Sequence, residues 1–256
     1  MLRWDDMKLN SIVEYLDGYL GIKGFPDFDG AENGLQVSGC EEVERVYTAV
    51  DASEEVIGRV KEKGPGILLV HHGLFWGAGR SLTGPLFRKV STLIEGEVAL
   101  YASHLPLDAH IDVGNCAVLA RACDLKPEGR FGDALGTEIG WWCDVELEIT
   151  ELAEVVGRVV GGKPRLVAGG PETTKKVAIV TGSVGNMVRQ ASECDVDTLI
   201  TGEGSHPNYH EALEFGINVI YAGHYATETW GVKALGLHLA ERFGLGVEFV
   251  DAPTGF

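Results

Sequence analysis

The chain has 256 residues, of which 45% are hydrophobic, and a formal net charge of −17. This length suits one large or two small globular domains, and the acidity disfavours DNA or RNA as the main partner because nucleic acids bind through Lys and Arg. The acidity also argues mildly against a small anionic substrate, although a local cationic pocket can override it.

No apolar run is long enough to cross a bilayer, and the N-terminal MLRWDDMKLN lacks the basic and apolar stretches of a signal peptide. We therefore expect a cytoplasmic protein without membrane contact. The five cysteines include no CxxC pair, so neither a zinc knuckle nor a thioredoxin-like redox motif is present. Reduced, structural thiols are the simplest interpretation.

Short apolar runs alternate with longer amphipathic segments, which is the pattern of βα units. The predicted strands are apolar on both faces, as strands covered by helices must be. In chain order they span 46–50, 67–70, 98–102, 177–180, 198–200 and 218–222. The predicted helices span 9–19, 53–63, 86–95, 114–123, 149–159, 185–194, 210–215 and 227–242. An α/β fold with parallel or mixed sheets follows.

Polar residues that can bind metal follow the predicted strands, in segments that read DAS, HHG, SHLPLD, TGS, TGEGSH and GHYATE. In open α/β sheets the ligand lies beyond the carboxyl ends of the strands. We therefore expect one shared site there. Any one of these histidines by itself could be a loop residue without a role. Six of the eight histidines lie at these ends: His71, His72, His104, His206, His210 and His224.

Two histidine–carboxylate pairs have a spacing of four residues. His224 and Glu228 stand at the start of a predicted helix, which places imidazole and carboxylate on one face about one turn apart. His104 and Asp108 have the same separation, but Pro106 between them favours a loop or a helix start over a continuous helix. Either geometry can present both side chains to a metal.

Adjacent strand residues point to opposite faces, so His71 and His72 can share a site only where the strand gives way to a loop, as Gly73 indicates. A set of His, Asp and Glu without Cys suits Zn, Mn, Fe or Ni better than Mg or Ca. Three imidazoles and two carboxylates exceed the need of one open tetrahedral site. We therefore predict two divalent metal ions bridged by a carboxylate.

Several motifs together resemble the NIF-three-like family of hexameric proteins with a dinuclear metal centre, whose members are often called GTP cyclohydrolase 1 type 2. The matching motifs are NGLQVSG (33–39), HHGLFW (71–76), SHLPLDAHIDVGN (103–115), TGEGSH (201–206), GHYATE (223–228) and the final EFVDAP. The resemblance implies metal ligands at His71, His72, Asp108, His224 and Glu228, a further active-site histidine at His104, and a place in the TGE segment for Glu203.

The resemblance also implies two related α/β domains, a metal site in the cleft between them and a homohexameric ring. The chain is similar to the short members, which lack an inserted domain. We expect the first domain to comprise residues 1–127 and 222–256 and the second to comprise residues 128–221.

The activity that the resemblance implies is ring-opening hydrolysis of GTP with release of formate, in which His104 or Glu203 could move protons. A role in orienting a metal ligand competes with the catalytic role for both residues. Two alternatives remain: a binuclear metallohydrolase of another substrate such as a phosphoester, and a non-enzymatic, ring-forming metal-binding adaptor.

A nucleotide would need an anion site, for which the glycine-rich segments 77–84 and 181–186 are candidates. Glycines at such turns more often serve tight geometry.

Trp141 and Trp142 could stack on a base, but a place in a strand core or a subunit contact fits them better. We expect Phe75 and Trp76 to line the metal pocket or the core. Asp51 could support the site or, with Ser53, begin a helix. Asn33 and Gln36 belong either to the site or to a loop bonded to its own backbone.

Overall fold

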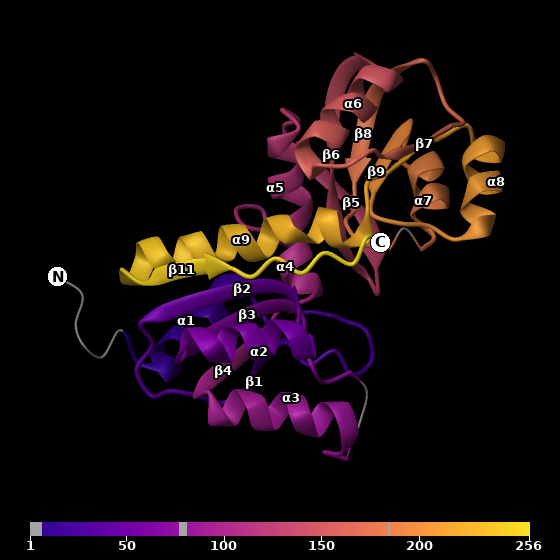
Figure 1. Cartoon of the computed structure of the whole chain (residues 1–256). Coiled ribbons are helices and arrows are strands. Elements are labelled where there is room, and N and C mark those ends of the chain that lie inside the picture. Colours follow the sequence, from indigo (N-terminus) through magenta and orange to yellow (C-terminus); the bar gives the residue numbers. More distant parts are fainter. Residues whose placement is uncertain (1–6, 77–80, 184) are drawn as a thin grey trace. The chain divides into compact units, whose positions relative to one another are not determined.

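The computed structural model describes residues 7–76, 81–183 and 185–256 (Figure 1). The chain divides into two compact units. The first comprises Met1–Leu107 and Gly231–Ala252, and the second comprises Asp108–Trp230 and Pro253–Phe256. Each unit has its own sheet flanked by helices. The predicted mixed α/β class is therefore confirmed.

The first unit contains a five-stranded sheet of order β1-β4-β3-β2-β11. Strand β1 pairs antiparallel with β4, whereas the other neighbours are parallel. Its strands are β1 (Gly34–Val37), β2 (Arg45–Asp51), β3 (Gly66–His72), β4 (Val98–Ala102) and β11 (Gly246–Phe249). Its helices are α1 (Leu9–Leu20), α2 (Glu54–Lys63), α3 (Gly84–Glu95) and the part of α9 (His224–Phe243) that begins at Gly231.

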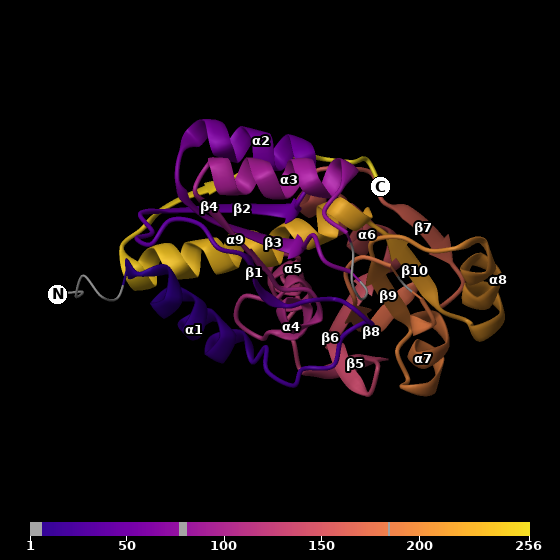
Figure 2. The same ribbon diagram turned by 90° about the horizontal axis from the view of Figure 1, so that it is seen from below.

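Helices cover both faces of this sheet (Figure 2). On one face α2 and α3 supply residues such as Val56 and Leu93 to a core that includes Leu68 and Leu100. On the other face α1 lies close enough for the Tyr101 hydroxyl to donate a hydrogen bond to Asp17 at 2.9 Å. Since both faces are buried, the central strands must be apolar throughout, as their sequences are.

The second unit contains a six-stranded sheet of order β5-β6-β8-β9-β10-β7. The pairs β8–β9 and β9–β10 are parallel, and the others are antiparallel. Its strands are β5 (Gly129–Ala134), β6 (Thr137–Glu148), β7 (Arg165–Ala168), β8 (Thr173–Ile179), β9 (Thr198–Thr201) and β10 (Asn218–Tyr221). Its helices are α5 (Asn115–Ala122), α6 (Ile149–Val160), α7 (Met187–Glu193) and α8 (His206–Phe215); the short α4 (Leu105–Ala109) enters it from the first unit.

Helices α5 and α6 bury residues such as Leu119 and Leu152 against Val177 and Ile200 of the sheet. Helix α7 contacts both β9 and the adjacent α8, which in turn contacts β7 and β10 (Figure 1). The tryptophan pair lies in β6. The Arg130 guanidinium is 3.9 Å from the Trp141 ring centroid, and the Lys176 ammonium is 4.5 Å from that of Trp142. These cation–π contacts support the structural interpretation of the pair.

The six predicted strands correspond to β2, β3, β4, β8, β9 and β10. Strand β6, in which buried and more exposed residues alternate, was not among the predicted strands, and neither were β1, β11, β5 and β7, the edge strands of the two described sheets. Edge strands bury fewer side chains: β11 has no buried residue and β7 has only Val167. Their sequences therefore lack the continuous apolar run that marks a central strand.

The division into units differs from the predicted domain boundaries, which placed residues 1–127 and 222–256 in the first domain. Helix α5 lies in the second unit because Cys116 and Leu119 pack into that unit's core. The first turns of α9 lie there too, since Trp230 packs against the same core. No helix in the described ranges combines the length and the apolar character that crossing a membrane requires.

Candidate metal-binding site

Three histidines of the first unit lie together at the carboxyl ends of two neighbouring parallel strands. His71 and His72 are the last residues of β3, and His104 follows β4 closely. One ring nitrogen of each lies within 4.8 Å of those of the other two. His71 is fully buried, whereas His72 and His104 are partly exposed. We call these three residues the histidine group.

The end of β3 brings the adjacent histidines together. The strand continues to His72, so the strand end expected at residue 70 is too early. Neighbouring strand residues ordinarily point to opposite faces, yet the ring centroids of His71 and His72 are 4.7 Å apart. Pairing with β2 stops at His72, opposite Asp51, and a Cβ at the following Gly73 would lie 2.3 Å from the Gln36 side chain. The strand pairing therefore ends at the second histidine, and the next residue is a glycine because Gln36 occupies the space that a side chain would need.

Each ring of the histidine group has an oxygen beside its Nδ1. The Nδ1 of His71 lies 3.0 Å from the Ser103 carbonyl oxygen. That of His72 lies 2.8 Å from Asp51 Oδ1, and that of His104 lies 2.8 Å from Asp27 Oδ1. An Nδ1–H donated to such an oxygen places the ring's lone pair on Nε2, the tautomer that binds metal through Nε2. All three rings thus have the support typical of metal-ligating histidines.

Asp27 is a residue that sequence analysis missed. Its side chain is only 4% exposed. Besides His104, its carboxylate accepts hydrogen bonds from the Asn33 side chain at 2.8 Å and the Leu105 backbone at 3.1 Å. Burial by itself would raise the pKa of Asp27, but the bond to His104 and that residue's charge outweigh it and lower the pKa. No local signal marks this aspartate, because its partner His104 is 77 residues away.

Asn33 and Gln36, for which a place in the site and a place in a self-bonded loop were both open, differ in their roles. Asn33 supports the site, because its side-chain oxygen accepts the His104 backbone N–H at 2.7 Å. Gln36 instead braces its loop by accepting the Leu74 N–H at 2.7 Å. The Trp76 ring lies edge-on to His104 with centroids 5.0 Å apart and forms a wall of the group.

Asp51 and Ser53 have separate roles. Asp51 binds the His72 ring, whereas the Ser53 hydroxyl caps α2 by accepting the Val56 N–H at 3.1 Å. The interpretation of Asp51 as support for the site is therefore the better one. Phe75 packs against the core of the first unit.

The second unit holds a histidine between two carboxylates. His224 begins α9, and Glu228 follows one turn later on the same face. The Nε2 of His224 lies 3.1 Å from Glu228 Oε2, and its Nδ1 lies 2.9 Å from Glu203 Oε1. Glu228 is only 3% exposed. We call these three residues the His224 group.

The two carboxylates hold a proton on His224. The bond to Glu228 raises the pKa most, burial opposes it, and Glu203 raises it further, so that the pKa of His224 is about 9. A cation is therefore favoured between these carboxylates, and in the metal-free protein at neutral pH that cation is the imidazolium itself.

Gly182 packs closely against the His224 group. Its φ is +68°, and a Cβ there would lie 2.3 Å from Glu228 Oε1 and 3.4 Å from His224 Nε2. Gly182 belongs to the segment 181–186 that was a candidate anion site. Its close approach to Glu228 favours the geometric interpretation of this glycine.

Asp108 lies in α4, with only 3% of the residue exposed. Its Oδ1 accepts hydrogen bonds from Asn115 Nδ2 at 2.9 Å and Thr181 Oγ1 at 3.1 Å. Buried, hydrogen-bonded carboxylates of this kind are held in a fixed orientation. Such an orientation suits a ligand, although these contacts do not by themselves assign one.

The histidines that follow the strands do not all join one group. His206 and His210 stand on the exposed side of α8, with ring centroids 5.5 Å apart in an edge-on arrangement. The expectation that all six would share a site is therefore not met by this pair. Of the glycine-rich segment 77–84, residues 77–80, which include Arg80, lie outside the described residues.

The donors of both groups fit divalent transition metals. They are imidazole nitrogens and carboxylate oxygens, which suit Zn, Mn, Fe or Ni better than Mg or Ca. The histidine group by itself could hold a metal ion.

Comparison with known proteins identifies the family. A model of the family Duf34/NIF3 (NGG1p interacting factor 3) matches residues 7–254. A "GTP cyclohydrolase 1 type 2 homolog" from Pyrococcus abyssi is 40% identical over 254 residues, covering 97% of this chain and all of its own length. A relative of the same name from Deinococcus radiodurans is 39% identical over 248 residues, covering 96% of this chain and 94% of its own.

Solved structures agree with the sequence relatives. A protein from Thermus thermophilus superposes with a TM-score of 0.89 at 42% identity, over 98% of this chain and all of its own. The protein ybgI, described as of unknown function, superposes with a TM-score of 0.90 at 33% identity over the same shares. The resemblance seen in the motifs is thus confirmed, and the chain belongs to the Duf34/NIF3 family.

Proposed function

We propose that the chain is a metal-dependent hydrolase with a dinuclear centre, of the GTP cyclohydrolase 1 type 2 kind. His71 and His72 from the first unit, and Asp108, His224 and Glu228 from the second, would hold two divalent ions. Asp108 would supply one of the carboxylate ligands. The names of the relatives support the substrate, and the arrangement of donors supports the metals.

The observation that carries this proposal is the histidine group. Three ring nitrogens within 4.8 Å of one another, on rings whose Nδ1 atoms each face an oxygen, require several long-range contacts. Packing alone would not need a carboxylate or carbonyl behind every ring. Ligand histidines do need one, because it sets the tautomer and the ring orientation.

Bound divalent ions would supply Lewis acidity and lower the pKa of a water molecule that attacks C8 of the guanine ring. His104 would then handle protons: its Nδ1 is held by the buried Asp27, so its Nε2 can accept a proton and return it to the opening ring. The edge-on Trp76 ring beside His104 would limit the access of water to this atom.

Glu203 fits a positioning role better than that of a proton shuttle. Its Oε1 is already engaged with His224 Nδ1 at 2.9 Å, which fixes the ring and keeps Nε2 directed at Glu228. A catalytic part for Glu203 would require it to leave this bond. Glu203→Gln should therefore weaken metal retention clearly and change the pH profile of turnover little.

Reconstitution of the metal-free protein with Zn, Mn, Fe or Ni separately, followed by incubation with GTP, tests the function. Formate release and loss of guanine absorbance are the readouts. His72→Ala should abolish both, whereas His210→Gln, a change at an exposed histidine outside the proposed metal ligands, should leave both intact.

Absence of turnover with both sites loaded would overturn the GTP reaction. Phosphoester substrates would then be assayed, since two metals can also clamp attacking and leaving oxygens. If these failed as well, a metal-binding adaptor would be the remaining function. The homohexameric ring is part of the same proposal, and light scattering of the purified chain tests it.

A further inference from the structure

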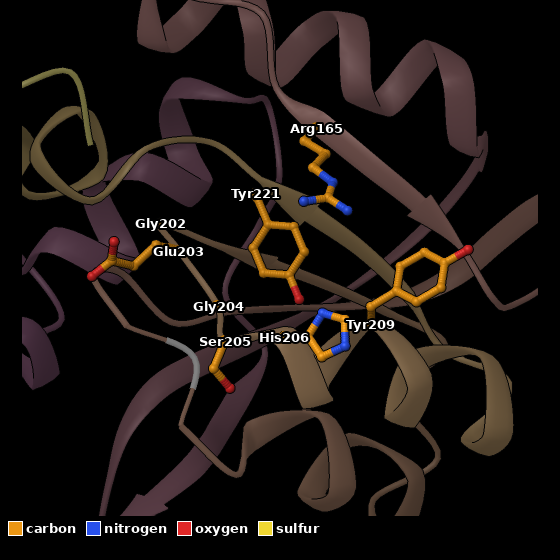
Figure 3. Close-up of a pocket in the computed structure, with 8 residues that line it drawn as sticks. All are labelled: Arg165, Gly202, Glu203, Gly204, Ser205, His206, Tyr209 and Tyr221. Carbon is orange, nitrogen blue, oxygen red and sulfur yellow. The ribbon is translucent and has the colours of Figure 1, made fainter.

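A cavity of about 630 Å³ opens in the second unit beside the His224 group (Figure 3). It lies where β9, β10 and β7 meet the start of α8. Eight residues line it: Arg165, Gly202, Glu203, Gly204, Ser205, His206, Tyr209 and Tyr221. Glu203 belongs both to this lining and to the His224 group.

The cavity carries positive charge in a strongly acidic protein. Arg165 is the first residue of β7 and lies directly opposite Tyr221 of β10, so both side chains point to the same face of the sheet. Among the described residues no carboxylate lies within ion-pair distance of the Arg165 guanidinium. Its guanidinium is therefore able to bind an anion, even though the chain as a whole has a net charge of −17.

The nearby carboxylates are engaged elsewhere. Figure 3 shows the Glu203 carboxylate turned away from Arg165, and its Oε1 bonds His224. Glu211, which acts on Tyr221 electrostatically, accepts a hydrogen bond from Asn208 at 2.9 Å. Neither therefore neutralises the guanidinium directly.

Polar donors surround the space next to Arg165. His206, the first residue of α8, contributes an imidazole on the same side of the cavity as the Tyr221 ring (Figure 3). Burial raises the pKa of Tyr221 despite the opposing charge of Arg165, so its hydroxyl keeps its proton at neutral pH. The ten-residue α8 adds the positive end of its dipole at the Ser205 cap.

The backbone holds this arrangement tightly. A Cβ at Gly204 would lie 2.6–2.9 Å from the ring and hydroxyl of Tyr221, and a Cβ at Gly202 would lie 2.7 Å from the Cα of His224. The segment 202–204 thus passes between the cavity and the His224 group with no room for side chains at either glycine. An anion bound beside Arg165 would be held next to the proposed metal ligands of the same unit.

We propose that this cavity binds the phosphate part of a phosphorylated substrate, with Arg165, His206 and the Tyr221 hydroxyl as its contacts. The reacting part of the substrate would extend past Glu203 toward His224. This inference rests on the proposed function for the identity of the reaction, but the anion site itself stands on the cavity and its donors. It resolves the conflict between an acidic protein and an anionic substrate, because the positive charge is local.

Pyrophosphate binding to the chelator-treated, full-length protein, measured by titration calorimetry, tests the site without metal. Arg165→Gln should weaken binding about 10-fold or more, because a charge-assisted hydrogen bond is lost. Arg158→Gln, at an exposed arginine of α6 outside the cavity, should change it less than about twofold. Circular dichroism would verify that both variants fold, and Tyr221→Phe should weaken binding by a smaller factor.

Equal pyrophosphate affinity of the wild-type protein and Arg165→Gln, or no binding by either, would overturn the site. With GTP and metal, Arg165→Gln should raise KM while kcat changes little. Arg165-dependent pyrophosphate binding without any GTP turnover would uphold the anion site and remove only the proposed reaction. Turnover with an unchanged KM in Arg165→Gln would uphold the proposed reaction and remove the anion site.

Discussion

The two units present histidine in opposite surroundings. In the first unit three imidazole rings gather at strand ends, each with one oxygen beside its Nδ1. In the second a single ring lies between two carboxylates at the start of a helix. The first arrangement depends on strand pairing, and the second on the periodicity of α9. Donors suited to metal are thus assembled by long-range contacts in the first unit and by local helical spacing in the second. Different substitutions should therefore disrupt each group.

The largest expected effect tests the long-range assembly of the first unit. Asp27→Ala removes a buried carboxylate from His104, Asn33 and the Leu105 backbone, so the free energy of unfolding should fall by about 3 kcal/mol. Urea denaturation of the metal-free protein measures it. Asp29→Ala, at an exposed neighbouring aspartate, should cost less than about 0.5 kcal/mol. Equal losses in the two variants would show that Asp27 does not anchor the histidine group.

The next effect tests the tight packing of the second unit. Gly182→Ala places a methyl group against Glu228, which should lower the free energy of unfolding by about 2 kcal/mol more than Gly161→Ala does. Gly161 has a φ of +70°, close to the +68° of Gly182, but open space around it, so the pair isolates the contact from backbone strain. Thermal or urea denaturation gives both values. Metal retention should also decrease in Gly182→Ala alone.

A smaller effect is the pH dependence of the free energy of unfolding that His224 of the second unit should cause. The pKa of His224 is about 9 in the folded, metal-free protein and about 6.5 in an unfolded chain. Its raised folded pKa contributes stability that is fully present below about pH 6.5 and is lost as the pH rises through 9. The loss should be on the order of 1–2 kcal/mol. Urea midpoints of the chelator-treated protein between about pH 6 and 10 measure it.

His224→Gln should flatten this pH dependence, whereas His210→Gln should preserve it. An unchanged slope in His224→Gln would assign the dependence to other groups.

The smallest effect concerns the cysteine thiols, three of which are buried in the second unit. Burial raises the pKa values of Cys116, Cys123 and Cys143 to about 12, so they should resist alkylation at about pH 8 in the native protein. The exposed Cys194 should react first, and Cys40 more slowly, since burial raises its pKa too. Mass spectrometry after a short iodoacetamide pulse identifies the labelled residues. Rapid labelling of Cys143 would indicate that the second unit opens readily.

The central strands and most helices were predictable because their signals are local. The run before His71 is apolar on both faces, and the spacing of His224 and Glu228 by itself puts them one helical turn apart. Residue chemistry likewise indicated transition metals without reference to the fold. Neither the edge strands nor β6 gave a comparable signal, because none of them buries more than two consecutive residues.

Sequence by itself determined the βα pattern, the family and the donor types, since these depend on composition, periodicity and motif order. Only the tertiary structure decided which groups support the donors: Asp27 behind His104, Gly182 against Glu228, and Arg165 opposite Tyr221. Each of these contacts joins residues that are far apart in the chain. Chain folding creates such contacts through strand pairing and packing, and no local periodicity encodes them.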